Sequence, residues 1–270
     1  SSADFITIYL ALELQALSFY AMACIQRSSA FSIEAGFKYF ISGAFFSAIF
    51  LFGCSLIFGV TGTLSLRVLC DLAAFSFNSN LDVLLSIGFL FVSITILFKL
   101  SIIPFHFWSL DAYDGAPTAS TVIFSLLPKI PLIVLLMKLY VIFYHEFSFI
   151  IHIISFIASC SFVISTLLTI DQFSFKRFLV YSSIAQVSLL ITSLSPIGGE
   201  CTFEWFIYDF SNAFFFLACY LMTSLIAWTI YAIQAEAKFL LLKNNEIHTS
   251  DTPSEESTFH FSSLGLFSRH

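Results

Sequence analysis

Charged side chains are scarce in this chain: they make up 10% of its 270 residues, whereas hydrophobic residues make up 59%. A soluble domain carries about a quarter charged residues, so this chain lacks the polar surface that would cover its apolar side chains in water. Lipid is the solvent in which exposed apolar surface is not penalised. The composition therefore predicts a membrane protein.

Basic residues are also few, and the formal net charge is −6. This balance argues against a nucleic-acid partner, which requires clustered Lys and Arg. The six cysteines include no C-x-x-C pair and mostly lie in apolar runs, so we interpret them as small buried hydrophobes. We therefore expect neither an iron–sulfur cluster nor a structural zinc ion. The cysteines are Cys24, Cys54, Cys70, Cys160, Cys201 and Cys219.

An initiator Met is missing as well, because the chain opens on Ser1. We expect either that a leader has been removed or that the sequence is part of a longer protein. The first apolar run follows Asp4 and not a basic segment, so it is not typical of a signal peptide. The 36 Phe residues favour AT-rich coding DNA, which is common in organelle genomes.

Long apolar runs dominate what is present. A membrane-spanning helix needs about 20 mostly apolar residues. About seven such runs lie near residues 4–26, 36–60, 81–108, 118–144, 147–170, 178–195 and 203–236. They predict an all-α, polytopic transmembrane helix bundle over residues 1–243. Residues 244–270 are polar and acidic and include a proline, so we expect a loop or mobile tail there.

The orientation follows from the basic residues in the loops. Lys and Arg collect after the first, fifth and seventh runs, and these loops fall on one side of the membrane. The positive-inside rule places that side in the matrix or cytoplasm, together with residues 244–270. The basic residues are Arg27, Lys176, Arg177, Lys238 and Lys243.

Four ionisable residues lie inside apolar runs: Glu13, Lys38, Lys99 and Lys129. A charge at the centre of a bilayer costs roughly 2.5–3.5 kcal/mol on insertion scales. Each of these side chains therefore needs a partner or a function. Lys38 has a further alternative, because it lies near the start of its run, where a long side chain can reach the membrane interface.

One interpretation is a proton relay. Burial lowers the pKa of an amine and raises that of a carboxylic acid by up to about 3–5 units, and a nearby opposite charge acts in the other direction. A lysine whose carboxylate partner approaches and withdraws therefore has a switchable proton affinity, as a pump needs. The alternative is a fixed ion pair that only orients helices.

Three prolines add context to two of the lysines: Pro104 follows Lys99, and Pro128 and Pro131 flank Lys129. Proline removes a backbone donor and breaks a helix, and broken membrane helices are tolerated where they are buried or line a hydrated cavity. His106 follows Pro104 and can pass protons near neutral pH. A simple packing kink and a packing histidine are the alternatives.

Residues 98–118 carry the most specific pattern. They read FKLSIIPFHFW over 98–108 and DAYDGAPT over 111–118. This pattern resembles the FK-x-x-x-x-PFH-x-W-x-x-D-x-Y-x-G-[AS]-P signature of antiporter-like membrane subunits. Residues 9–17, which read YLALELQAL, are similar to the glutamate helix of that family. The runs at 34–45 and 176–185 resemble the subunit 2 branch of NADH dehydrogenase, respiratory complex I.

The resemblance implies an antiporter-like inverted-repeat fold with broken helices, and a proton-translocating subunit of NADH:ubiquinone oxidoreductase. Glu13 would modulate the first lysine, Lys99, and Lys129 would be the central relay lysine. Lys38 and His106 would be accessory residues on the same polar axis. The family has no redox chemistry of its own here, so NADH, FMN, iron–sulfur clusters and ubiquinone would lie in other subunits.

The chain also departs from the family pattern. No equivalent of the family's exit lysine is present, and residues 186–189 read QVSL where the family often has His-x-Gly-Tyr. We therefore expect other membrane-arm subunits as partners, with lipids, and a separate polypeptide that supplies missing helices. The resemblance implies the mitochondrial inner membrane, with a bacterial plasma membrane as the alternative. A free-standing cation/proton antiporter and a structural membrane scaffold are the rival functions.

Overall fold

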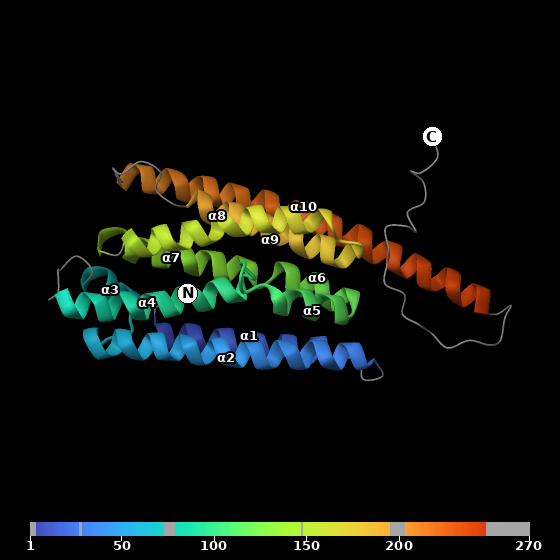
Figure 1. The fold of residues 1–270 in the computed structure, drawn as a ribbon, viewed down its shortest axis with the longest axis horizontal. Coiled ribbons are helices and arrows are strands. Elements are labelled where there is room, and N and C mark those ends of the chain that lie inside the picture. Colours follow the sequence, from blue (N-terminus) through green and yellow to red (C-terminus); the bar gives the residue numbers. More distant parts are fainter. Residues whose placement is uncertain (1–3, 27–28, 73–78, 147, 195–202, 247–270) are drawn as a thin grey trace.

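The computed structural model describes residues 4–26, 29–72, 79–146, 148–194 and 203–246. All regular elements in these ranges are helices, and the longer ones run roughly along the long axis of the molecule (Figure 1). The helices are α1 (Phe5–Ala23), α2 (Ala30–Thr61), α3 (Leu66–Leu72), α4 (Ser79–Lys99), α5 (Phe107–Gly115), α6 (Thr118–Leu126), α7 (Lys129–Glu146), α8 (Ser148–Ile170), α9 (Phe175–Ser193) and α10 (Phe203–Glu246).

Five helical segments in the described ranges are long and apolar enough to cross a membrane. The apolar part of α4, Val83–Lys99, is shorter, and α9 does not reach the required length and hydropathy together. The predicted all-α transmembrane bundle is confirmed. Helices α4 and α9 belong to it but are less suited by length and hydropathy to cross a membrane alone. The five segments are Phe5–Ala23, Ala30–Thr61, Thr118–Tyr140, Phe149–Ile170 and Phe210–Ala235.

The segment Thr118–Tyr140, made of α6 and α7, is the centre of the bundle. Of its most apolar stretch, 56% is buried inside the protein, against 22–33% for the other four segments. The outer helices expose large apolar side chains, such as Ile170 at 80% and Leu14 at 73%. Such faces suit lipid or other apolar partners and would be unfavourable in water.

Helices α2 and α4 approach closely because each has a glycine at the crossing. A Cβ atom on Gly53 would lie 2.8 Å from the backbone oxygen of Gly88, and one on Gly88 would lie 3.1 Å from the oxygen of Gly53. Small residues at such a contact let membrane helices pack backbone against backbone. This crossing places α4, and therefore Lys99 at its end, against α2.

One predicted break is confirmed and one boundary differs from the sequence prediction. The apolar run near residues 81–108 is broken around Pro104 as predicted, because α4 ends at Lys99 and α5 begins at Phe107. Residues 111–117 are predicted from their composition to form a polar break, but α5 extends into them as far as Gly115. Their carboxylates do not interrupt the helix because Asp111 and Asp114 pair with basic residues of other helices.

At the C-terminal end, α10 continues to Glu246, beyond the expected end of the bundle at residue 243. The loop or tail is predicted over 244–270, and residues 247–270 of it lie outside the described residues.

Candidate functional site

Helix α4 ends in a Schellman turn immediately after Lys99. The Ile102 amide donates to the Leu97 carbonyl at 3.0 Å, and the Ser101 amide donates to the Phe98 carbonyl at 2.9 Å. Ser101 has φ 62°, the left-handed conformation that this turn requires and that usually belongs to glycine. The turn leaves Lys99 in the last turn of α4, where the negative end of the helix dipole favours a cation.

Aromatic side chains pack around the break between α4 and α5. The Trp108 indole N–H donates to the Phe98 carbonyl at 2.9 Å, so this oxygen at the end of α4 is satisfied by a residue of α5. From α2, Tyr39 stacks on Trp108 with ring centroids 4.5 Å apart, and Phe46 stacks on Phe98 at 3.8 Å. The break is therefore a packed, hydrogen-bonded structure.

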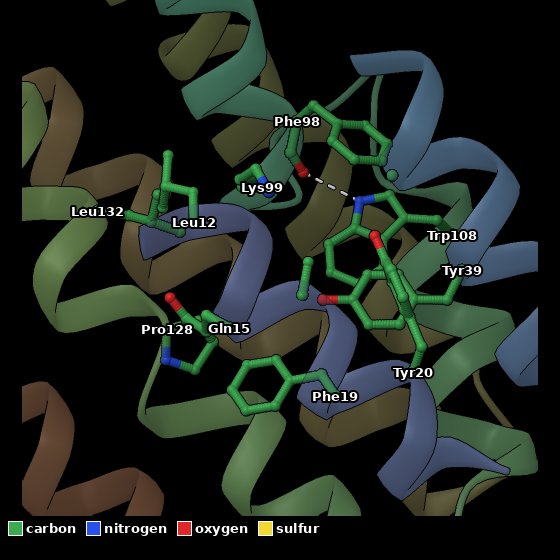
Figure 2. Close-up of a pocket in the computed structure, with 12 residues that line it drawn as sticks. Leu12, Gln15, Phe19, Tyr20, Tyr39, Phe98, Lys99, Trp108, Pro128 and Leu132 are labelled. Atoms are coloured by element: carbon green, nitrogen blue, oxygen red, sulfur yellow. Dashed lines mark hydrogen bonds between the residues drawn. The ribbon is translucent and has the colours of Figure 1, made fainter. Parts of the chain in front are cut away.

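A cavity of about 20 Å³ lies beside this break. This is the volume open to the centre of a water molecule, and roughly 10–15 Å³ of it is enough to hold one water. The cavity therefore has room for a single water. Figure 2 shows Tyr20, Tyr39 and Trp108 on one side of it and Pro128 and Leu132 on the other. The lining residues are Leu12, Gln15, Ala16, Phe19, Tyr20, Tyr39, Gly43, Phe98, Lys99, Trp108, Pro128 and Leu132.

Glu13 lies next to the cavity and does not line it. Its side chain is partly buried, and its charge acts on both Lys99 and Tyr20. Within the described part of the chain, Glu13 and Lys99 form no ion pair shorter than 4.0 Å. The charge of Glu13 therefore acts on Lys99 without direct contact, and Lys99 lines the cavity.

Lys129 is the first residue of α7 and is 3% exposed. Its Nζ donates a hydrogen bond to the Tyr220 hydroxyl of α10 at 2.8 Å and lies 5.3 Å from the centre of the Tyr220 ring. The Tyr220 hydroxyl in turn donates to the Ser125 carbonyl at 3.4 Å. Among the described residues no carboxylate pairs with Lys129.

The break between α6 and α7 has a local cause in Pro128. Because proline has no N–H, the Phe124 carbonyl loses its helical donor. The Tyr113 hydroxyl of α5 donates to this carbonyl at 3.1 Å, while Tyr220 serves the next carbonyl, that of Ser125. Two tyrosines from different helices thus satisfy the backbone at the break that precedes Lys129.

Lys38 lies in a different setting from the other two lysines. It pairs with Glu34 of its own helix at 2.9 Å and with Asp111 of α5 at 3.0 Å, and its side chain is 48% exposed. It does not line the cavity. The structure therefore places Lys38 in a half-exposed ion-pair group that ties α2 to α5.

His106 precedes α5 and is 5% exposed. Its ring lies 4.3 Å from that of Phe107 and 6.0 Å from that of Tyr181 on α9, and it does not line the cavity. Nδ1 has no hydrogen-bond partner among the described residues. The structure thus brings His106 close to α9 and does not join it to Lys99.

Of the three prolines, Pro128 lines the cavity, while Pro104 and Pro131 are exposed. Pro104 lies between α4 and α5, and Pro131 lies in the first turn of α7. Breaks therefore occur at Pro104 and Pro128, whereas α7 continues through Pro131, and only Pro128 of the three lines the cavity.

Sequence reasoning missed the tyrosines and the ion pairs that hold α5. Tyr113 and Tyr220 are almost fully buried, and a buried hydroxyl in an apolar run signals that a partner must exist. Arg177 pairs with Asp114 at 2.9 Å, and the Lys176 ammonium donates to the carbonyls of Asp114 and Ala116 at the end of α5. From the sequence these basic residues indicated only membrane orientation.

The fold and the site together define a polytopic helical membrane protein with two broken helices, a partly buried lysine at the first break and a buried lysine at the second. The chain belongs to the family described as NADH:quinone oxidoreductase/Mrp antiporter, TM, whose model matches residues 2–239. The resemblance seen in the sequence motifs is thereby confirmed.

Two relatives and one solved structure illustrate the family. The chain is 38% identical over 201 residues to NADH-ubiquinone oxidoreductase chain 2 of Marchantia polymorpha, covering 72% of this chain and 40% of that protein. It is 34% identical over 242 residues to NADH-quinone oxidoreductase subunit N of Ruthia magnifica subsp. Calyptogena magnifica, covering 84% and 46%. The chain thus spans less than half the length of these curated relatives.

A chain of respiratory complex I from Thermus thermophilus has the same fold, with a TM-score of 0.67. The match covers 86% of this chain and 47% of that one, at 24% sequence identity. At this identity the likeness supports the fold alone.

Proposed function

We propose that this chain is part of a core membrane-arm subunit of respiratory complex I and translocates protons through Glu13, Lys99 and Lys129. The observation that carries the proposal is the cavity that adjoins both helix breaks: Lys99 lines it, and so does Pro128, the residue before Lys129. Buried ionisable residues beside a cavity with room for water are the parts that a proton path needs.

The arrangement has a simple physical function. The charge of Glu13 acts on Lys99 without direct contact, so a small change in their separation changes the affinity of Lys99 for its proton. A water in the cavity can bridge Lys99 toward the start of α7. The energy for such a change would come from quinone reduction in another subunit, where NADH, FMN, iron–sulfur clusters and ubiquinone would also be bound.

The partners in this proposal are other complex I membrane-arm subunits and lipids. The mitochondrial inner membrane is the proposed location, because curated relatives include NADH-ubiquinone oxidoreductase chain 2 of a plant. The bacterial relatives of the subunit N type leave a bacterial plasma membrane as the alternative. A separate polypeptide that supplies further helices stays a prediction, as do accessory roles for Lys38 and His106.

Neutral variants of the first pair test the proposal. Lys99→Met and Glu13→Gln remove the charges that the path requires, so we expect NADH-driven proton pumping to fall several-fold in the assembled complex. Pumping is measured by the quenching of a pH-sensitive dye in native membrane vesicles. Lys138→Met is the matched control, because Lys138 is an exposed lysine of α7. Wild-type pumping by both test variants in a fully assembled complex would refute the proposal.

The family description also names Mrp antiporters, so a free-standing cation/proton antiporter subunit is the second candidate. Purification of the protein from native membranes, with its bound subunits, distinguishes the complex I subunit from the antiporter subunit. Co-purification with flavin- and cluster-bearing subunits supports complex I, whereas isolation with antiporter subunits alone supports the alternative. A static scaffold would instead keep normal proton flux after Lys129 is neutralised.

A further inference from the structure

The Tyr220 hydroxyl contacts both sides of the α6–α7 break. It accepts a hydrogen bond from Lys129, at the start of α7, and donates one to the Ser125 carbonyl, at the end of α6. Tyr220 lies on α10 and is 3% exposed, so its ring is packed inside the protein. A residue from a distant part of the chain thus holds the buried amine.

This hydrogen-bond chain has a direction. Lys129 donates, Tyr220 accepts and donates onward, and the last acceptor is a backbone carbonyl. A carbonyl has no proton to release and no further acceptor to serve, so the chain ends there. In this arrangement Tyr220 holds Lys129 and does not conduct its proton.

Residues near Lys129 in the chain separate its side chain from the cavity beside Lys99. The cavity beside Lys99 is lined by Pro128, the residue before Lys129, and by Leu132, further along α7, and Lys129 itself does not line it. Figure 2 shows Pro128 and Leu132 on the side of the cavity opposite Trp108. While Lys129 is bonded to Tyr220, its amine therefore has no access to water in this cavity.

We propose that Tyr220 is a positioning residue that holds Lys129 away from the Lys99 cavity, so that a proton delivered to Lys129 cannot return to Lys99. The proposal rests on the proton path of the preceding section. When the bond to Tyr220 opens, the flexible side chain of Lys129 can turn toward the cavity and exchange a proton through its water. When the bond closes, the two lysines are separated, and transfer proceeds in one direction.

Tyr220→Phe removes the hydroxyl and keeps the ring. Without its acceptor, Lys129 spends more time on the cavity side, and protons return to Lys99. We expect fewer protons pumped per NADH oxidised, with NADH oxidation per assembled complex unchanged. A merely structural role would lower the amount of complex and leave this ratio constant, so the ratio is the decisive measurement.

Tyr140→Phe is the matched control. Tyr140 is also 3% exposed, lies on α7, and its hydroxyl has no hydrogen-bond partner within the described ranges. We expect this variant to keep the wild-type ratio. Tyr220→Leu lacks both the acceptor and the ring, so we expect a ratio at least as low as that of Tyr220→Phe.

The variant Lys129→Met distinguishes a failure of the holding role of Tyr220 from a failure of the proton path itself. If it loses pumping and Tyr220→Phe keeps the wild-type ratio, the holding role of Tyr220 is wrong and the proton path stands. If Lys129→Met also keeps wild-type pumping, the proton path itself is wrong. A lowered ratio in Tyr220→Phe, with a normal ratio in Tyr140→Phe, supports the holding role.

Discussion

Lys129 and Lys138 lie on the same helix and differ in every respect that bears on proton transfer. Lys129 is 3% exposed and bonded to a buried tyrosine, whereas the side chain of Lys138 is exposed. The sequence alone distinguishes them only by depth in the apolar run. The structure adds the reason: Lys129 begins α7 directly after Pro128, where the break leaves room for a polar contact with α10.

Ser101 is the residue at which the backbone of the first break is under strain. It is the left-handed residue of the Schellman turn, and for an L-amino acid with a Cβ this conformation costs roughly 1–2 kcal/mol. Ser101→Gly should relieve most of that cost and raise the free energy of unfolding by about 1 kcal/mol. Thermal unfolding of the purified assembly in detergent measures the effect.

The comparison for Ser101→Gly is Ser101→Val. A β-branched residue fits the left-handed region poorly, so this variant should melt at a lower temperature than the wild type. Equal melting of both variants would mean that the turn after Lys99 is not shaped as described.

Among the elements, the contact between α2 and α4 has the least room for change. A Cβ on Gly53 would meet the Gly88 carbonyl at 2.8 Å and force the two helices apart. Gly53→Ala should therefore destabilise the bundle by about 1–3 kcal/mol, as overpacking of a close contact does. The amount of assembled complex and its melting temperature report the loss.

Gly59 offers a control on the same helix. A Cβ at Gly59 would meet no atom within 4 Å, so Gly59→Ala should assemble and melt like the wild type, or slightly better because alanine favours a helix. If Gly53→Ala behaved in the same way, the close crossing of α2 and α4 would be incorrect.

Most helices and both breaks could be predicted from apolar runs and prolines. Helix α5 could not, because its acidic residues have the composition of a polar loop. Asp111 and Asp114 are tolerated in a helix only because Lys38 and Arg177 reach them from α2 and α9. Such pairs join residues far apart in the chain, and no local pattern reveals them.

The candidate site was predictable to a similar degree. Apolar surroundings single out Glu13, Lys99 and Lys129, and the structure places the first two within electrostatic reach and the third behind the cavity wall. Lys38 and His106 fall outside this group, because depth along a run does not tell which side of a helix faces which neighbour. Tyr113 and Tyr220 went unnoticed because their importance comes from carbonyls freed on another helix.

For the whole molecule, the two breaks lie near the middle of the bundle, with α2 on one side and α9 and α10 on the other (Figure 1). Helices α2 and α9 fix α5 by ion pairs, while α10 fixes the α6–α7 break through Tyr220. The central segment can therefore respond to movement on either side. This arrangement suits a subunit that couples distant events to a proton path.

The central claim is that a buried lysine at the second break carries protons. The most direct test is the number of protons pumped per NADH oxidised in native vesicles containing Lys129→Met, compared with Lys138→Met. Both variants remove one ammonium from α7, and only Lys129 lies at the proposed path. The account predicts a lowered ratio for Lys129→Met and a wild-type ratio for Lys138→Met, and equal ratios in the two assembled variants would contradict it.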